Sequence, residues 1–510
     1  MAATLMLACS NDKSGGHDGD EGVETEVNGT QLDGNTTLYG LVTDTSGNPV
    51  PGVVVSDGYG CVTTDANGVY QMERYKKARF VHYSTPAGYA VNTSADNYPL
   101  FYSEIVHKNI ADRHDFVLTP LPAPESDFTL VCIADPQCAT TAEISRYVNE
   151  TIPDVEATVD GYKAKGTPVY GITLGDIVFD TPDLWSNMKE SMANRNLPIF
   201  QTIGNHDHLQ TETSDDNAAA NFETQFGPRN YSFNRGDVHF IAMDNIIFTG
   251  TDYTGGFTDE QVAWLEKDLG FVPTDKMVIL YYHIPLRDNT GYLNRKKVLD
   301  MISRYKNPTL MCAHTHYFQP YHMRSHKLFE RIHGGTCGYF WRSTCGGDGT
   351  PNGFMVYEID GTEIIDTYFK ASQRADDYQI RLYRGNAEFA GPYATYKYDV
   401  GADVVVANVF TSGMDDTTWK VELSEDGGKT WSVMTEMSQS YGDRWIRGYH
   451  IGVEKHPVES GTSPCYHQYQ CKLKNPEATG IVVRATDSFN HVYTQTRFNE
   501  SNDFTEAEGY

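Results

Sequence analysis

Six apolar runs in the middle of the chain limit its fold more than any other feature. They read FTLVCIAD, PVYGITLGD, LPIFQTIGNHD, HFIAMDN, MVILYYHIP and TLMCAHTH, and five of them end in a polar or acidic cluster. Runs of this kind are typical of strands buried inside a sheet. Between them, residues 142–162 and 258–269 space their apolar side chains at three and four, as helices do, with Thr258 as the expected N-cap. The pattern predicts a layered α/β domain with functional loops at its strand ends.

The segments on both sides of these runs follow a period-two pattern instead. Residues 38–72 alternate apolar and polar side chains between the turn sequences SGNP and DANG, which is typical of strands and hairpins. Short strand patterns return beyond about Ala371, where residues 424–431, SEDGGKTW, resemble the Asp-box, a structural turn motif. We therefore expect two mainly β domains, both sandwiches, to flank the α/β domain.

A length of 510 residues requires several domains, because single cores stop growing beyond roughly 250 to 300 residues. We divide the chain into residues 1–36, a lipoprotein-type signal remnant and acidic linker; 37–122, the N-terminal β-sandwich; 123–372, the α/β domain; and 373–510, the C-terminal β-sandwich. The formal net charge of -28 opposes binding to a nucleic acid polymer, which depends on clustered Lys and Arg. No stretch approaches the ~20 apolar residues of a bilayer span, so we expect no transmembrane helix.

The first residues, MAATLMLACSNDKSGG, resemble the end of a bacterial lipoprotein signal, in which a short apolar run ends at Cys9. The resemblance implies an exported protein with a lipid anchor at Cys9, on the periplasmic or cell-surface side of the outer membrane. An ordinary terminus with an unpaired cysteine is the alternative. An exported compartment would permit disulfides, and Cys337 with Cys345 and Cys465 with Cys471 are close pairs, although spacing alone does not establish a bridge.

Polar residues with metal-binding side chains follow five of the apolar runs. They are Asp135 and Gln137; Asp176; Asn205, His206 and Asp207; His283; and His314 and His316. Any one of them alone is more often a satisfied buried polar group than a ligand. A chance sequence rarely supplies all five clusters in this order, each at the end of an apolar run, so together they indicate a metal site.

The ligand types narrow the choice of metal. Carboxylates, imidazoles and amide oxygens suit hard to borderline divalent ions. The absence of a cysteine cluster argues against a structural zinc site. A carboxylate that bridges two ions, for which Asp176 is the candidate, suits displacement at phosphorus. Two divalent ions against Asp135 and Asp176 leave a local charge of about plus two, which would attract a phosphate to an otherwise acidic protein.

With these motifs, residues 126–370 resemble the calcineurin-like metallophosphoesterase family, and residues 38–72 resemble the transthyretin-like or carboxypeptidase-regulatory-like sandwich of exported bacterial enzymes. The first resemblance implies that the α/β domain is a catalytic domain of four layers, αββα, with two divalent ions. It implies one ion held by Asp135, Gln137, Asp176 and His316, and another held by Asp176, Asn205, His283 and His314. His206 would act as transition-state stabiliser or as general acid for the leaving oxygen.

Two positions depart from the family pattern. Gln137 stands where a histidine is usual, and because an amide oxygen is a weaker and harder ligand than imidazole, we expect one metal site to bind more loosely. Phe179 stands where the protein-phosphatase branch has an acid that supports the catalytic histidine, and Asp180 comes one residue later. The partner of His206 is therefore open, because the adjacent Asp207 could instead point into the fold.

A Gly-rich loop at residues 333–354 follows the last metal motif and carries Tyr339, Phe340, Trp341 and Arg342. These four residues could line the substrate pocket, with aromatic faces for a sugar or base and Arg342 for a phosphate. The alternative is a loop that packs on a neighbouring domain, and the sequence does not decide between the two.

The main functional hypothesis is a metal-dependent phosphoesterase that favours a phosphomonoester and needs two ions, chosen from Mn, Fe, Zn or Mg. A hydroxide bridging the ions would attack phosphorus while His206 assists the departing oxygen. The alternative within this class is a phosphodiesterase or pyrophosphatase acting on a nucleotide- or sugar-type substrate. A hypothesis of another class is a non-catalytic surface protein whose β-sandwiches bind glycan or protein.

Overall fold

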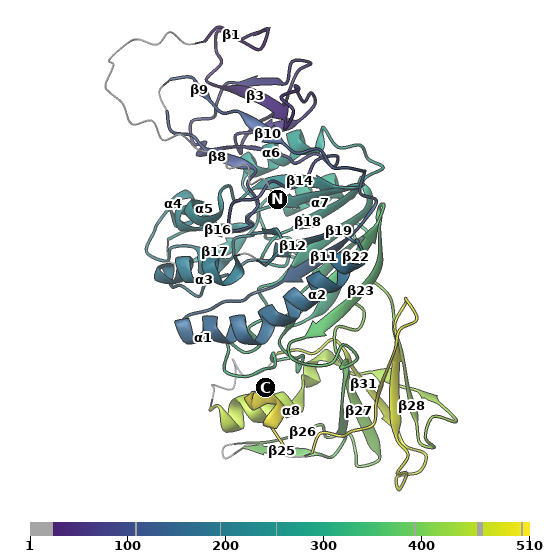
Figure 1. The fold of residues 1–510 in the computed structure, drawn as a ribbon. Helices are drawn as coiled ribbons and strands as arrows, with labels where there is room; N and C mark the ends of the chain where they lie inside the picture. The colour runs from purple at the N-terminus through teal and green to yellow at the C-terminus, as the bar shows by residue number, and fades with distance from the viewer. Residues whose placement is uncertain are drawn as a thin grey trace, which may run out of the picture.

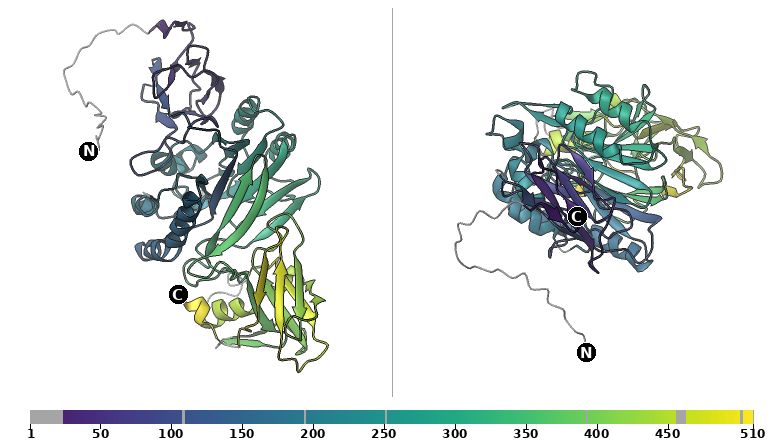
Figure 2. Two further views of the ribbon diagram at one scale, coloured as in Figure 1. Left: turned by 45° about the vertical axis from the view of Figure 1, so that its right-hand side comes forward. Right: turned by 90° about the horizontal axis from the view of Figure 1, so that it is seen from above.

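The computed structural model describes residues 24–107, 110–193, 195–250, 252–391, 394–455, 463–500 and 503–509. Cys9 and most of the predicted linker 1–36 lie outside these residues. Three bodies follow one another along the molecule, with an N-terminal β domain at one end, an α/β domain in the middle and a C-terminal β domain at the other end (Figures 1 and 2).

The six apolar runs form strands in two sheets of the central domain, as the sequence predicts. The first sheet has the order β13 (Ile199–Phe200), β12 (Val169–Thr173), β11 (Asp127–Ile133), β22 (Gly353–Asp360), β23 (Glu363–Ala371). The second has the order β14 (Tyr231–Arg235), β15 (Val238–Ala242), β18 (Met277–Tyr281), β19 (Lys306–Cys312), β21 (Leu328–Ile332), β20 (Gln319–Met323). Strands β11, β12 and β13 are parallel, and so are β15, β18 and β19. Their carboxyl ends therefore meet at one edge of each sheet.

Helices cover the outer face of each sheet. Helices α1 (Thr141–Arg146), α2 (Ile152–Ala164) and α3 (Trp185–Met192) belong to the first sheet, and α6 (Asp259–Leu269) and α7 (Arg295–Ile302) to the second. Val155 and Val159 of α2 share one apolar cluster with Val131 of β11, whereas the next residue on this strand, Cys132, shares a cluster with Ile279 of the second sheet. The central domain is thus the expected αββα sandwich. Thr258 caps α6 as predicted, accepting from the backbone N–H of Gln261.

Each flanking domain consists of two small sheets packed face to face. One N-terminal sheet contains β3 (Leu38–Asp44), β6 (Val69–Met72), β9 (Asp112–Arg113) and β10 (Phe116–Leu118). The other contains β4 (Val54–Ser56), β5 (Cys61–Thr63), β7 (Phe80–Tyr83) and β8 (Tyr102–Glu104). One C-terminal sheet contains β24 (Ile380–Arg384), β27 (Val404–Val409), β30 (Thr435–Glu436) and β31 (Gln468–Lys472). The other contains β28 (Lys420–Ser424), β29 (Ser432–Val433), β32 (Val482–Thr486) and β33 (Val492–Gln495). The fold class predicted from the sequence is confirmed.

Smaller elements complete the chain. They are the hairpins β1 (Glu26–Val27) with β2 (Thr30–Gln31), β16 (Ile246–Phe248) with β17 (Tyr253–Gly255), and β25 (Glu388–Gly391) with β26 (Ala394–Lys397), and the helices α4 (Asp215–Ala218), α5 (Ala220–Phe226), α8 (Arg444–Arg447) and α9 (Thr505–Glu508). None of the described helices is long and apolar enough to cross a membrane. The cysteines in the described ranges are unpaired, so neither Cys337 with Cys345 nor Cys465 with Cys471 forms a bridge.

Candidate metal centre

The predicted metal ligands meet where the parallel strands of both sheets end. Asp135 and Gln137 follow β11, Asp176 follows β12, and Asn205 follows β13 in the first sheet. His283 follows β18, and His314 and His316 follow β19, in the second sheet. The centre therefore lies across the junction of the two sheets, and each sheet contributes part of it.

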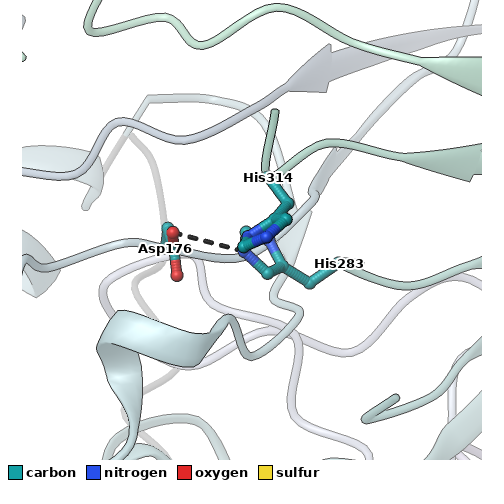
Figure 3. A group of neighbouring side chains, drawn as sticks. All are labelled: Asp176, His283 and His314. Carbon is teal, nitrogen blue, oxygen red and sulfur yellow. Dashed lines mark hydrogen bonds and ion pairs between the residues drawn. The ribbon is translucent and has the colours of Figure 1, made fainter. Parts of the chain in front are cut away.

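One group of ligand atoms comes from Asp176, Asn205, His283 and His314. His283 Nε2 lies 3.2 Å from Asp176 Oδ2 (Figure 3). The same nitrogen lies 2.9 Å from Asn205 Oδ1. His314 Nδ1 lies 2.8 Å from Asn205 Oδ1 and 3.2 Å from His283 Nε2. Two ring nitrogens this close to each other and to two side-chain oxygens could together serve as ligands of one cation. These four residues are the set that the sequence resemblance assigned to one ion.

Burial and hydrogen bonding fix the state of these rings. The Nδ1–H of His283 donates to the Leu174 carbonyl at 2.8 Å, which directs Nε2 toward the group, as backbone partners do for metal-binding histidines. Burial lowers the pKa of His314 to about 3, so this ring is neutral and offers a lone pair. Burial also acts to lower the pKa of His283, but the charge of Asp176, its hydrogen bond to the ring and the charge of Asp135 together outweigh burial and raise that pKa to about 9. The buried carboxylates thus favour a cation at this position.

A second group of ligand atoms comes from Asp135, Asp176 and His316, which lie within 4.8 Å of one another. Asp135 is fully buried and its Oδ2 has no hydrogen-bond partner among the described residues, although a buried carboxylate oxygen normally has one. His316 Nε2 lies 3.8 Å from Asp135 Oδ1, and burial lowers the pKa of this ring to about 4. An unpartnered carboxylate oxygen beside a neutral imidazole fits a divalent ion.

Gln137 lies beside this second group, but its amide nitrogen faces the carboxylate. Nε2 donates to Asp176 Oδ2 at 3.0 Å, and Oε1 lies 3.9 Å from the sulfur of Cys337. Half a turn of the amide would place Oε1 beside Asp176, where both oxygens could share one ion. Gln137 therefore reaches the centre, as the sequence predicts, and its amide must turn before its oxygen can act as a ligand.

The backbone of the ligand loops is strained, as often happens at functional sites. Asp135, Gln137, Asp176, His314 and His316 all have positive φ, between 40° and 68°. Two glycines allow the close approach of these loops. A Cβ on Gly175 would lie 2.6 Å from His283 Nδ1, and one on Gly204 would lie 2.2 Å from Asp176 Oδ1.

The structure shows which acid partners His206. The Nδ1–H of His206 donates to Asp180 Oδ1 at 3.0 Å, and its ring stacks on Phe179 with 4.3 Å between centroids. Burial acts to lower the pKa of His206, but the hydrogen bond to Asp180 and the charges of Asp176 and Asp180 together outweigh burial, so the pKa is raised. Asp207 points into the fold, where its Oδ1 accepts from the backbone N–H groups of Ile177 and Val178. His206 thus has Nε2 available at the edge of the centre.

The four candidate substrate residues of loop 333–354 do not all reach the centre. The half-buried Phe340 does, with its ring 4.9 Å from His316. Trp341 is 4% exposed and donates from Nε1 to the Pro136 carbonyl at 2.7 Å, and Tyr339 stacks on His450 of the C-terminal domain at 4.2 Å. Arg342 is exposed. Tyr339 and Trp341 therefore anchor the loop, whereas Phe340 lies beside a candidate metal ligand.

Sequence reasoning overlooked Tyr253, which begins β17. Its ring contacts His314 edge-on, with 6.2 Å between centroids and 85° between planes. The residue lies outside the strand-end motifs, in a hairpin whose distance from the centre no periodicity reveals. Phe179 was noted only as an interruption of a motif, although its ring supports His206.

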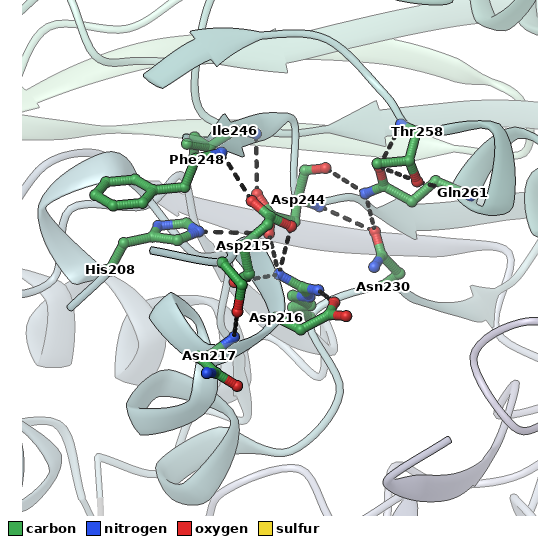
Figure 4. Close-up of polar contacts among 12 residues, drawn as sticks. His208, Asp215, Asp216, Asn217, Asn230, Asp244, Ile246, Phe248, Thr258 and Gln261 are labelled. Carbon is green, nitrogen blue, oxygen red and sulfur yellow. Dashed lines mark hydrogen bonds and ion pairs between the residues drawn. The ribbon is translucent and has the colours of Figure 1, made fainter. Parts of the chain in front are cut away.

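His208, Asp215 and Asp244 form a third group of possible ligands (Figure 4). Arg229 already supplies a cation there, because its Nη1 lies 3.1 Å from Asp215 Oδ2 and 3.1 Å from Asp244 Oδ2. The Nδ1–H of His208 donates to the Gly204 carbonyl at 2.8 Å. We therefore interpret this group as a buried charge network.

The curated relatives of the chain match part of its length at low identity. It is 26% identical over 166 residues to a probable glycerophosphodiester phosphodiesterase of Arcobacter nitrofigilis, covering 30% of this chain and 58% of the relative. It is 24% identical over 180 residues to a 3',5'-cyclic-nucleotide phosphodiesterase of Nostoc sp., covering 33% of this chain and 63% of the relative. The chain thus spans 58% and 63% of the length of these relatives.

Among solved structures, a purple acid phosphatase from yellow lupin (Lupinus luteus) seeds aligns with a TM-score of 0.32 and 13% identity, over 49% of this chain and 55% of that one.

Three models of one protein family match consecutive parts of the sequence. Residues 36–121 match the N terminal of Calcineurin-like phosphoesterase, residues 128–318 match Calcineurin-like phosphoesterase, and residues 330–493 match the C terminal of Calcineurin-like phosphoesterase. The chain therefore belongs to the calcineurin-like phosphoesterase family.

Proposed function

We propose that the protein hydrolyses a phosphate ester with two divalent metal ions. The observation that carries the proposal is the convergence of ligand atoms from both sheets onto two adjoining groups that share Asp176. Asp135, Gln137, Asp176 and His316 would hold one ion, and Asp176, Asn205, His283 and His314 the other. Bound there, the ions would supply charge for the phosphate and lower the pKa of water.

His206 would act on the leaving oxygen of the ester. Its Nδ1–H is engaged by Asp180, which fixes the ring and leaves Nε2 as the atom that transfers a proton. Its backbone N–H donates to Asp176 Oδ1 at 2.9 Å, so the backbone of His206 is held against the carboxylate shared by both ligand groups. This placement supports a role as general acid.

The class of ester is part of the proposal. The ligand types do not distinguish a phosphomonoester from a phosphodiester, and we favour the monoester. Both curated relatives carry the names of phosphodiesterases, which supports a diester as the second candidate. Release of p-nitrophenol from its phosphate monoester and from its bis-ester by the purified protein, loaded with Mn, Fe, Zn or Mg, separates these outcomes.

The same experiment tests the proposal against the non-catalytic alternative. Metal content is measured on the same samples, and we expect two ions per chain and turnover that stops on chelation. A protein that binds no metal and cleaves neither ester would support the surface glycan- or protein-binding hypothesis instead.

We further propose that the protein is exported and anchored by lipid at Cys9, with the acidic stretch after it as a tether. The support is the apolar run that ends at this cysteine. Mass spectrometry of protein from its own host should show diacylglycerol on Cys9. An unmodified N-terminus in the cytoplasmic fraction would contradict this proposal.

A further inference from the structure

Three half-buried aromatic residues border the metal centre, and each comes from a different segment of the chain. Phe179 follows β12, Tyr253 begins β17, and Phe340 lies in loop 333–354. The inner ligands Asp135 and His283 have 0% exposed area. The three aromatic residues and the histidines His206, His314 and His316 are only partly buried, so a substrate can contact them beside the buried ligands.

Phe340 and Phe179 form one side of this approach. The ring of Phe340 lies 4.9 Å from that of His316 and meets Phe179 edge-on at 5.7 Å and 73°. Phe179 in turn stacks on His206 at 4.3 Å and 21°. The four rings thus run without interruption from a predicted metal ligand to the proposed general acid.

Tyr253 forms another part of the border. Its ring meets His314 edge-on at 6.2 Å, and its backbone pairs with Phe248 in the β16–β17 hairpin. Phe248 is held in turn by a hydrogen bond of 2.9 Å from its backbone N–H to Asp215 Oδ1 (Figure 4). The buried charge network therefore fixes the hairpin that carries Tyr253.

The backbone of loop 333–354 is built to hold Phe340 in place. Phe340 and Trp341 both have a positive backbone φ, 49° and 59°, which residues other than glycine rarely adopt. Trp341 Nε1 donates to the carbonyl of Pro136, which lies between Asp135 and Gln137 in sequence. Such backbone strain persists only where the surrounding structure enforces it. Here the strained turn holds the ring of Phe340 beside the metal ligands.

We propose that Phe340 and Tyr253 form a subsite for a planar ring in the ester group of the substrate, with Phe179 supporting Phe340 and orienting His206. The substrate class is then a phosphate ester of a ring-bearing alcohol such as a nucleoside, because aromatic faces stack on flat rings with little demand on their identity. This inference rests on the proposed phosphoesterase function.

The test compares two phosphates of primary alcohols that differ in carrying a ring, thymidine 5'-phosphate and glycerol 3-phosphate. If the parent cleaves only diesters, the pair becomes the methyl ester of thymidine 5'-phosphate and the methyl ester of glycerol 3-phosphate, which can both release methanol. Values of kcat/KM and metal content are measured for the parent, Phe340→Ala, Phe340→Tyr, Tyr253→Ala and Phe271→Ala. Phe271 is 44% exposed and precedes β18, at the opposite end of that strand from His283, and serves as the control.

We expect the parent to prefer the thymidine ester. Phe340→Ala and Tyr253→Ala should each lower kcat/KM on it by about 5- to 50-fold and on the ring-free ester by less than about threefold, as removal of a base-stacking side chain does. Phe340→Tyr should keep the preference, and Phe271→Ala should match the parent. Equal losses on both esters, or no loss on either, would overturn the inference. A metal-loaded parent that cleaves no ester would overturn the proposed function instead.

Discussion

At the scale of single residues, Asp176 holds the two ligand groups together. Its Oδ2 lies 3.2 Å from His283 Nε2 and 3.0 Å from Gln137 Nε2, and it is 1% exposed. Asp176→Asn keeps the shape but removes the negative charge, so we expect loss of both ions and a fall in turnover of at least ~10²-fold. Elemental analysis and kinetics on one preparation check this. A variant with two ions per chain and parental turnover would show that Asp176 is no bridge.

Gln137 should make the two metal sites unequal. Its amide must exchange a hydrogen bond to Asp176 for contact with an ion, and amide oxygen binds later transition metals more weakly than imidazole does. Calorimetric titration of metal into stripped protein should therefore show two steps. Gln137→His should tighten the weaker step and Gln137→Ala should weaken it, each by about tenfold or more. If Gln137→Ala binds two ions as tightly as the parent, the amide only shapes the turn.

His206 should contribute to turnover without binding metal. Its ring nitrogen Nδ1 is engaged by Asp180, and none of the ligand groups found among the described residues includes His206. His206→Ala is expected to keep both ions and to slow turnover by about 10² to 10⁴-fold. Asp180→Ala should keep both ions with a smaller loss, because the ring remains stacked on Phe179. Loss of an ion in His206→Ala would place this residue among the ligands.

At the scale of elements, strand ends were predictable from the sequence and contacts between loops were not. The apolar runs located β11, β12, β13, β18 and β19, and parallel pairing then brought their polar ends together. The partner of His206 depends on a φ of 52° at Asp180, which spacing does not reveal. The aromatic run at Tyr339–Trp341 was ambiguous for a similar reason, because the strained turn sends neighbouring rings to different domains.

Helix α4, helix α5 and the turn before β16 are joined through Arg229, which pairs with Asp215, Glu223 and Asp244. The side chain of Arg229 is 12% exposed and pairs with Asp215 and with Asp244, of which the latter is 1% exposed. Arg229→Ala would leave buried charge unpaired, so we expect the free energy of unfolding to fall by about 3–5 kcal/mol in urea denaturation. Arg113→Ala is the control, because Arg113 pairs with the exposed Glu24 and such pairs contribute roughly 0–1 kcal/mol. Equal losses in both variants would contradict the role of the network.

At the scale of the whole molecule, neither flanking domain is a loosely attached module. On the N-terminal side, Phe101 packs against Phe200 and Tyr231 of the central domain, with ring centroids 5.9 and 4.8 Å apart. On the C-terminal side, loop 333–354 lies between the metal loops and the C-terminal sheets. Ser343 Oγ lies 2.8 Å from His450 Nε2, and Arg381 of β24 donates to the Gly349 carbonyl. The C-terminal domain thus holds the loop that carries Phe340.

Asp348 provides a direct test of this coupling between domains. It is 1% exposed, and its Oδ2 accepts from the backbone N–H of Phe318, two residues after His316, and lies 3.1 Å from His467 Nε2 in the C-terminal domain. Asp348→Ala leaves these buried groups unpaired, at a cost of about 1–3 kcal/mol for each in the free energy of unfolding. The loop and the turn after His316 should then lose their fixed positions, so we expect kcat/KM to fall by about tenfold although Asp348 touches none of the ligand groups.

Asp426→Ala is the matched control for Asp348→Ala. Asp426 also accepts several hydrogen bonds, from the backbone N–H groups of Lys429 and Thr430, but it lies in the Asp-box turn, away from loop 333–354. Its loss should lower stability and leave kcat/KM unchanged. Both variants are assayed at a temperature where urea denaturation shows them fully folded, with metal content measured alongside. Asp348→Ala could instead turn over as the parent does while it is still folded and carries two ions. The contact that joins His467 to the turn after His316 would then be dispensable, and the C-terminal domain would not position the centre.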